Sequence, residues 1–107
     1  MDKSFIRFIG FLLLVLFSYS IWATDTIKII VKTNDNAGAI GYRVDGTDHG
    51  GLGKLYVGNG PKGKEYFFGY RKDSVFGKDI KCGSLILSKD TVANLIVQDN
   101  KCIIQLG

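Results

Sequence analysis

The chain has 107 residues, of which 14 are glycine and one is proline, and it carries a net charge of +4. A chain of this length forms one small domain and has no room for a second. The mild positive charge permits weak attraction to anionic surfaces, but it does not require a nucleic acid as partner.

The N-terminus has the layout of a secretory signal peptide, with a basic start, an apolar centre and small residues before the cleavage site. Lys3 and Arg7 provide the basic start, and Phe8–Ala23 provides the rest. The alternative is an uncleaved membrane anchor, but this stretch is shorter than the ~20 residues of a spanning helix. We therefore expect residues 1–23 to be a cleaved signal helix, and residues 24–107 to be the single domain of a secreted or periplasmic protein.

The mature part of the chain alternates apolar and polar side chains with a period of two, which is the pattern of half-buried β-strands. The runs are short and rich in β-branched and aromatic residues, which suit a pleated sheet. They begin at Ile27, Ile40, Leu55, Tyr66, Ile80, Leu85, Ala93 and Cys102. No window has the spacing of an amphipathic helix, so the pattern predicts an all-β domain.

Clusters of glycine, asparagine and aspartate separate these runs, and such residues tolerate the positive φ that tight turns need. The expected long loops and tight turns are Asn34–Gly38, Asp45–Gly53, Gly58–Gly63, Ser88–Asp90 and Gln98–Asn100. Many short strands at this spacing are typical of a sandwich or barrel. The predicted fold is a small antiparallel β-sandwich, or a partly open barrel, of seven to eight short strands with one disulfide.

The two cysteines of the chain, Cys82 and Cys102, both lie in the mature part. Export exposes them to an oxidising compartment, where a small domain gains stability from a disulfide. The alternatives are two free thiols or a bridge between two chains. We expect an internal bridge, which closes a loop on the order of 20 residues and adds about 3 kcal/mol in the chain-entropy model. It would tie the strand around Ile80 to a C-terminal hairpin of Thr91–Val97 and Lys101–Leu106.

The only histidine, His49, lies close to Asp45 and Asp48 in the sequence. Two carboxylates and an imidazole are ligands that a divalent cation accepts. The alternative is a solvated turn in which the aspartates bond to their own backbone. The spacing matches neither an EF-hand nor a zinc motif, so we assign no metal and no other cofactor.

An enzymatic role would require a few scattered side chains to converge. Glu65 is the only glutamate, and Arg43 and Arg71 are the only arginines of the mature part. A cluster of His49, Glu65 and Arg71 would suit acid–base chemistry in a small secreted hydrolase such as a nuclease. Nothing in the spacing requires the three to meet, and the alternative places Glu65 and Arg71 on the outside of a strand. We therefore name no catalytic residue and keep the hydrolase as the alternative function.

Four aromatic residues fall within Tyr66–Tyr70, and they cannot all face the core from one strand. Alternation turns Phe67 outwards when its two neighbours face inwards. Together with Tyr56 and Phe76 it would form an exposed aromatic patch, a type of surface that binds partners. The alternative is that loops or a second sheet cover this face.

The leading prediction is a small, secreted, glycine-rich binding module without enzymatic activity, comparable in role to an effector, an adhesin or an inhibitor. It would present its loops and its aromatic face to a protein or a glycan outside the cytoplasm. We expect no specific nucleic-acid partner and no membrane span after cleavage of the signal. The predicted binding residues are His49, Tyr56, Phe67, Arg71 and Phe76.

Overall fold

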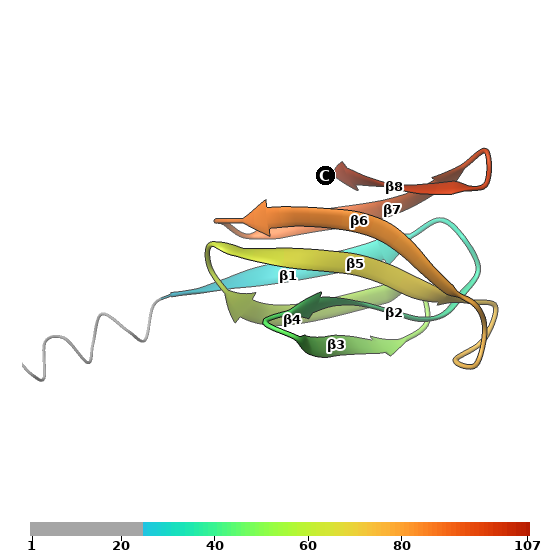
Figure 1. Ribbon diagram of the computed structural model, residues 1–107, viewed down its shortest axis with the longest axis horizontal. Coiled ribbons are helices and arrows are strands. Elements are labelled where there is room, and N and C mark those ends of the chain that lie inside the picture. The colour runs from blue at the N-terminus through green and yellow to red at the C-terminus, as the bar shows by residue number, and fades with distance from the viewer. Residues whose placement is uncertain (1–24) are drawn as a thin grey trace, which may run out of the picture.

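The alternation of apolar and polar residues produces eight β-strands within residues 25–107, the part of the chain that the computed structural model describes (Figure 1). In chain order these are β1 (Thr26–Thr33), β2 (Ala37–Val44), β3 (Thr47–Leu52), β4 (Leu55–Pro61), β5 (Lys64–Lys72), β6 (Asp79–Leu87), β7 (Thr91–Gln98) and β8 (Lys101–Leu106). The predicted all-β fold is confirmed. The predicted signal peptide, residues 1–23, lies outside the described residues.

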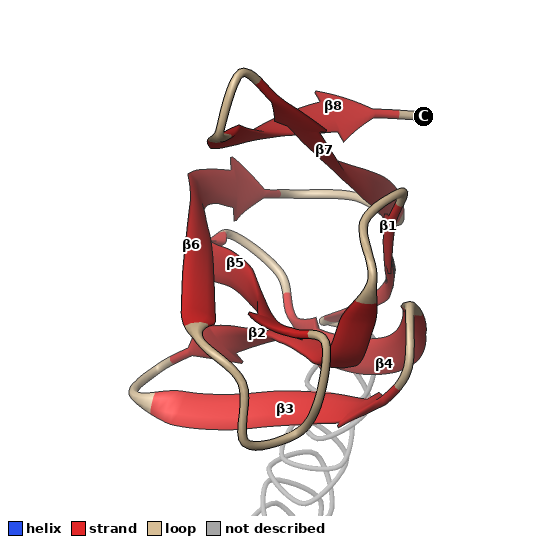
Figure 2. Ribbon diagram, turned by 90° about the vertical axis from the view of Figure 1, so that its right-hand side faces the viewer, coloured by secondary structure: helices blue, strands red, loops and turns tan. Residues whose placement is uncertain are grey.

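The strands form two four-stranded sheets with the orders β4-β1-β7-β8 and β3-β2-β5-β6. Figure 2 shows the strands of both sheets arranged around a common interior. Neighbouring strands are antiparallel except β1 and β7, which run parallel from Ile29 opposite Thr91 to Thr33 opposite Leu95. The sandwich is confirmed, and it departs from the antiparallel prediction at this pair because β1 and β7 are connected through the other sheet rather than by a hairpin.

Side chains from both sheets fill the interior between them, and Ile29, Val31 and Tyr66 are completely buried there. Each large apolar side chain that leaves water contributes about 1.5–3 kcal/mol to folding. The buried residues are Ile27, Ile29, Val31, Ala37, Ile40, Tyr42, Val44, Tyr66, Phe68, Tyr70, Cys82, Leu87, Ala93 and Leu95. No polar or charged residue is buried among residues 25–107, so the polar half of each strand faces solvent.

Two tight turns have the backbone conformation of two-residue hairpins. Asp45 and Gly46, between β2 and β3, have φ angles of 51° and 74°. Asp99 and Asn100, between β7 and β8, have φ angles of 51° and 63°. Positive φ at both central residues matches the twist of the flanking strands. The predicted C-terminal hairpin is therefore confirmed.

Two of the three expected long loops are wrong, because most of their residues belong to strands. His49–Gly51 lies inside β3, and Gly58–Pro61 ends β4. The reason is visible at Gly50, where a Cβ atom would lie 2.7 Å from the carbonyl oxygen of Ile40 on the neighbouring strand. Glycine marks a close approach of two strands at this point rather than a bend of the chain.

The predicted disulfide between Cys82 and Cys102 is present, with the two Cα atoms 4.7 Å apart. Cys82 belongs to β6 and Cys102 to β8, which are edge strands of different sheets. The bridge therefore closes the side of the sandwich where these two edges meet. On the opposite side, a short turn joins β3 to β4, the other two edge strands.

The loop between β1 and β2 is fastened to β5 through Asp35. The Tyr70 hydroxyl donates a hydrogen bond to Asp35 Oδ2, and Lys72 Nζ lies 3.0 Å from the same oxygen. The bond from Tyr70, followed by that from Lys72, lowers the pKa of Asp35 from 3.8 to about 2. Burial and the Asp35 carboxylate raise the pKa of Tyr70, so this hydroxyl keeps its proton and donates. The charged form of Asp35 is therefore part of the folded structure.

Candidate binding groove

The outer face of the β3-β2-β5-β6 sheet contains a row of glycines that crosses the strands. The register places Gly50 of β3 opposite Gly41 of β2, and Gly41 opposite Gly69 of β5. Lys81 of β6 lies opposite Gly69 and ends the row. Because glycine has no side chain, this row is the floor of a hollow.

Two rows of larger side chains flank the glycine row, and each follows from the same strand register. One wall consists of Asp48, Arg43, Phe67 and Ser84. The other wall consists of Ala39, Arg71 and Asp79. The hollow between them has a volume of about 690 Å³. We call it the glycine groove, with the glycine row as its floor and these two rows as its walls.

The backbone itself keeps side chains out of the groove floor. A Cβ atom on Gly69 would lie 2.6 Å from the carbonyl oxygen of Ile80, and one on Gly41 would lie still closer to that of His49. The strands approach closely here, so the groove is a direct consequence of how they pack. A site on paired strands is also held more rigidly than a site on loops.

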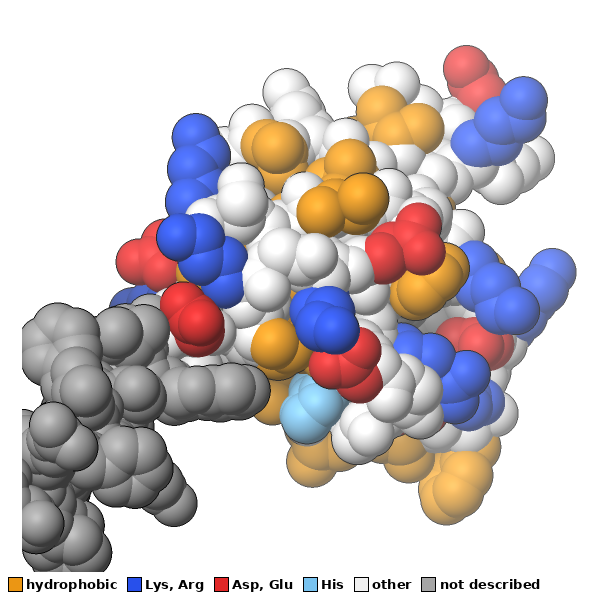
Figure 3. Space-filling model, turned by 60° about the vertical axis from the view of Figure 1, so that its left-hand side comes forward, with side chains coloured by type: hydrophobic (Ala, Val, Ile, Leu, Met, Phe, Trp, Pro, Cys, Tyr) orange, Lys and Arg blue, Asp and Glu red, His pale blue; other side chains and the backbone are white. Residues whose placement is uncertain are grey.

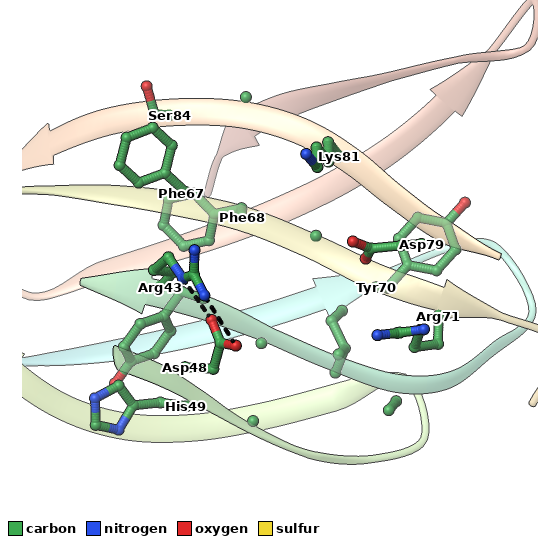
Figure 4. Close-up of a pocket in the computed structure, with 17 residues that line it drawn as sticks. Arg43, Asp48, His49, Phe67, Phe68, Tyr70, Arg71, Asp79, Lys81 and Ser84 are labelled. Carbon is green, nitrogen blue, oxygen red and sulfur yellow. Dashed lines mark hydrogen bonds and ion pairs between the residues drawn. The ribbon is translucent and has the colours of Figure 1, made fainter. Parts of the chain in front are cut away.

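Arg43 and Asp48 form an ion pair on one wall of the groove (Figure 4). Arg43 Nε donates to Asp48 Oδ1 at 2.9 Å, and Nη2 donates to Oδ2 at 3.5 Å. Both side chains are exposed, so the pair adds at most about 1 kcal/mol to stability. The guanidinium retains free N–H groups and the carboxylate retains free lone pairs, which a ligand can use.

Phe67 is the aromatic residue of the groove, and its side chain is 50% exposed. It points away from the core because β5 alternates, with Tyr66 and Phe68 buried on the other side. This is the direction that the sequence predicted for Phe67. An aromatic ring held at the surface between Arg43 and Ser84 can offer an apolar contact to a ligand.

Arg71 and Asp79 lie on the opposite wall as cross-strand neighbours of β5 and β6. Arg71 Nη1 donates to the carbonyl oxygen of Gly77 at 3.4 Å. Within residues 25–107, the side chains of Asp79 and Lys81 have no hydrogen-bond or ion-pair partner. Basic and acidic side chains are likewise intermixed on the molecular face in Figure 3, with hydrophobic side chains between them.

His49 and Tyr56, two other predicted binding residues, both pack against Tyr42. Partly exposed His49 also lines the groove, whereas Tyr56 does not. The His49 ring stacks on Tyr42 with centroids 5.4 Å apart, and the Tyr56 ring lies 5.8 Å from that of Tyr42. Tyr56 faces inwards because it lies opposite Val31, which is buried. The single aromatic patch expected from the sequence is therefore wrong as a grouping of Tyr56 with Phe67.

Phe76, the last of the predicted binding residues, lies in the loop between β5 and β6. Its side chain is 93% exposed, but it is not among the residues that line the groove. The structure thus brings His49, Phe67 and Arg71 together around the groove and leaves Phe76 at a separate loop.

The residues of the hydrolase alternative have different partners. Glu65 Oε2 accepts a hydrogen bond from Ser84 Oγ at 3.0 Å, Arg71 bonds to a carbonyl oxygen, and His49 stacks on an aromatic ring. No hydrogen bond or ion pair joins any two of these three side chains. The structure does not bring them together as an acid–base cluster.

The three residues considered for a cation are also separately engaged. Asp48 pairs with Arg43, His49 stacks on Tyr42, and Asp45 Oδ1 lies 3.8 Å from a lysine Nζ. In the part of the chain that is described, no group of three or more His, Cys, Asp or Glu residues is placed to hold a metal ion.

Sequence reasoning missed most of the groove, although one signal for it was present. Gly41 and Gly69 each begin the tripeptide Gly-Tyr-Arg. In both strands the tyrosine is buried, so the glycine and the arginine face outwards together. Two such tripeptides on neighbouring antiparallel strands place a glycine floor between two arginines. The wall residues that sequence reasoning did not select are Ala39, Arg43, Asp48, Asp79 and Ser84.

Comparison of the chain with protein-family models, curated proteins and solved structures gives no match in any of the three. Over the described range, 25–107, there is no helix long and apolar enough to cross a membrane. The chemistry of the groove is therefore the basis on which a function can be assigned.

Proposed function

We propose that this protein is a secreted, non-enzymatic binding module, and that the glycine groove is its binding site for a protein or a glycan. The observation that carries the proposal is the groove itself, a hollow of about 690 Å³ with a glycine floor and exposed polar walls. Paired strands hold Arg43, Phe67 and Arg71 in fixed positions around it. Rigid placement of polar and aromatic side chains around a concave surface is what a binding site requires.

A location outside the cytoplasm is supported by two features of the chain. The disulfide between Cys82 and Cys102 is of a kind that persists in oxidising compartments. The N-terminal sequence has the layout of a signal peptide. A secreted or periplasmic module agrees with both features.

A binding role is favoured over hydrolysis because the groove lacks an acid–base pair. Its only carboxylates are Asp48 and Asp79, which come from the edge strands β3 and β6, and its histidine packs against Tyr42. General acid–base catalysis needs two groups within hydrogen-bond reach of the same reacting atoms. The side chains of the groove are better suited to holding a ligand than to transferring its protons.

The proposal can be tested by capturing ligands from an extracellular extract on immobilised protein. The double variant Arg43→Ala/Phe67→Ala should lose at least about 90% of the captured material, because it removes one charged and one aromatic contact. His49→Ala should retain it, since His49 contributes no hydrogen bond to the groove walls. Retention by the groove variant, or loss of a measurable hydrolase activity in His49→Ala, contradicts the proposal. Thermal unfolding of each variant verifies that it is folded.

A further inference from the structure

The groove has an approximate two-fold arrangement about its two central glycines, which lie opposite each other on β2 and β5. Each of these glycines is followed by Tyr-Arg, so one arginine stands on each wall, Arg43 on one side and Arg71 on the other. Each arginine has an aspartate opposite it on the next strand, Asp48 for the first and Asp79 for the second. The two neighbouring Arg–Asp sets thus lie at diagonally opposite corners of the groove, one on β3 and β2 and the other on β5 and β6, with the glycine row between them.

Each Arg–Asp pair offers a donor beside an acceptor. Guanidinium N–H groups only donate hydrogen bonds, and a carboxylate only accepts them. A hydroxyl group does both, so two neighbouring hydroxyls on a ring match a neighbouring arginine and aspartate. Charged partners also make these bonds stronger than bonds between neutral groups. The two walls together suit a ligand with two separate pairs of adjacent hydroxyls.

Phe67 supplies an apolar contact on the same wall as Arg43. A sugar ring presents C–H groups on one face, and this face can cover an aromatic side chain and remove it from water. The groove crosses four strands and is therefore about 14 Å long, at about 4.8 Å between neighbouring strands. This length accommodates a short chain of linked sugar rings.

An extended peptide fits the groove less well. The floor lies on the face of a sheet, where backbone N–H and C=O groups are already paired between strands, so a peptide cannot add itself as a further strand. Its own backbone groups would then depend on a few wall side chains for partners. A chain of sugar rings has no such obligatory backbone groups.

A polyanion also fits the groove less well. Asp48 and Asp79 place one carboxylate on each wall, and both would repel the phosphates of a nucleic acid. The groove residues carry three basic and two acidic side chains, which nearly balance: Arg43, Arg71 and Lys81 against Asp48 and Asp79. Near-neutral walls with many hydrogen-bonding groups complement an uncharged polar ligand.

We infer that the glycine groove binds a neutral oligosaccharide, with adjacent hydroxyls on the two Arg–Asp pairs and one ring face on Phe67. This inference rests on the proposed function, because it names the ligand class of the same groove.

The test exposes protein purified from the full chain to an array of neutral oligosaccharides, acidic oligosaccharides, peptides and single-stranded DNA. The neutral oligosaccharide with the strongest signal is then titrated calorimetrically. We expect Phe67→Ala to weaken its binding about tenfold and Ala39→Trp, which fills the groove, to abolish it. Val57→Ala on the other sheet is the matched control, because Val57 and Phe67 are both 50% exposed. It should leave the affinity unchanged.

The outcomes separate this inference from the proposed function. Failure of every neutral oligosaccharide to bind overturns the inference, and so does an affinity that neither Phe67→Ala nor Ala39→Trp changes. If a peptide or an acidic glycan binds instead, and both variants weaken it, the inference is wrong but the proposed function stands. If DNA binds instead and both variants weaken it, the inference and the proposed ligand classes are both wrong. If no ligand responds to either variant, both are wrong. Phe67→Ala keeps the test decisive should Ala39→Trp fail to fold.

Discussion

The glycines of the groove floor and those of β4 face in opposite directions. On the β3-β2-β5-β6 sheet the glycine row faces outwards and leaves a groove. On the β4-β1-β7-β8 sheet, Gly58 and Gly60 face inwards, opposite two buried isoleucines of β1. A Cβ atom at Gly58 would collide with the hydroxyl of Tyr42, and one at Gly60 with that of Tyr66. The inward glycines thus make room for aromatic rings, whereas the outward glycines leave the groove open.

The outer faces of the two sheets differ accordingly. On the paired strands of the β4-β1-β7-β8 sheet, each described outward position carries a side chain, as in the apolar row of Val57, Ile30 and Val92. No row of glycines crosses that face, so its strands form no equivalent floor. This difference is consistent with the proposal that the β3-β2-β5-β6 sheet provides the binding surface.

Filling the groove floor should have the largest effect on the free energy of unfolding. In Gly41→Ala the new methyl group would meet the carbonyl of His49, a backbone atom that cannot move away without disrupting β3. We expect a loss of more than about 3 kcal/mol in the free energy of unfolding, measured by urea titration. Gly58→Ala meets side-chain atoms of Tyr42 and Tyr56, which can shift, so it should cost about 1–2 kcal/mol. If Gly41→Ala and Gly58→Ala lose the same free energy of unfolding, the outward and inward glycines do not differ in the way described.

Loss of the disulfide should have the second-largest effect on the free energy of unfolding. The bridge joins β6 to β8, so its removal separates the two sheets at one edge while the β3–β4 turn holds the other. For a sequence separation of 20 residues, the double variant Cys82→Ala/Cys102→Ala should lose about 3 kcal/mol. Reduction of the wild-type protein with dithiothreitol is the control and should lower the urea midpoint similarly. A loss below about 1 kcal/mol would mean that packing alone holds this edge.

Removing the hydroxyl group should change the free energy of unfolding in opposite directions at Tyr42 and at Tyr66. The Tyr42 hydroxyl is buried without a hydrogen-bond partner among the described residues, whereas the Tyr66 hydroxyl donates to the Pro61 carbonyl at 2.6 Å. Tyr42→Phe should therefore be neutral or stabilise by about 1 kcal/mol, and Tyr66→Phe should destabilise by about 1 kcal/mol. Tyr42→Phe should also reduce the cost of Gly58→Ala. Two destabilising tyrosine variants would contradict this account of the inward glycines.

Asp35 should make stability depend on pH at one end of the sandwich. The pKa of Asp35 is lowered from 3.8 to about 2, so the unfolded chain takes up a proton before the folded chain does as the pH falls. Its contribution is complete above about pH 4 and is lost as the pH falls towards about 2. Urea midpoints measured across that range should fall less steeply for Asp35→Asn than for the wild type. If the urea midpoints of the wild type and of Asp35→Asn fall in parallel with pH, a group other than Asp35 causes the loss of stability.

Most of the fold could be predicted from the sequence because its signals are local. Alternation within β5 places Tyr66 inside and Phe67 outside, and this follows from the geometry of one strand. The disulfide followed from having two cysteines in a chain predicted to be exported. β3 was missed because Thr47–Leu52 contains two glycines and no alternation of apolar residues. Its strand conformation is imposed by pairing with β2.

The groove could not be predicted in the same way, because it depends on register between strands. Phe67 and Arg71 were found from one strand, but Arg43 joins them only because it lies opposite Phe67 in the β2–β5 pairing. Asp79 joins only through the β5–β6 pairing. Tyr56 was placed on the wrong face because Leu55 and Val57 are also apolar, and alternation alone cannot show which set faces the core.

The smallest effect on stability should come from the ion pair of the groove, and this makes it the sharpest probe of function. Arg43 and Asp48 are exposed, so Arg43→Gln, Asp48→Asn and the double variant should each change the free energy of unfolding by less than about 1 kcal/mol. The same variants remove a charged donor or acceptor from the groove wall and should weaken ligand binding about tenfold. Urea titration and calorimetric titration of the same samples measure the two effects side by side. If these variants lose much stability while ligand binding is unchanged, the outer face of the β3-β2-β5-β6 sheet contributes to folding and not to binding. The outer faces of the two sheets would then not differ in role.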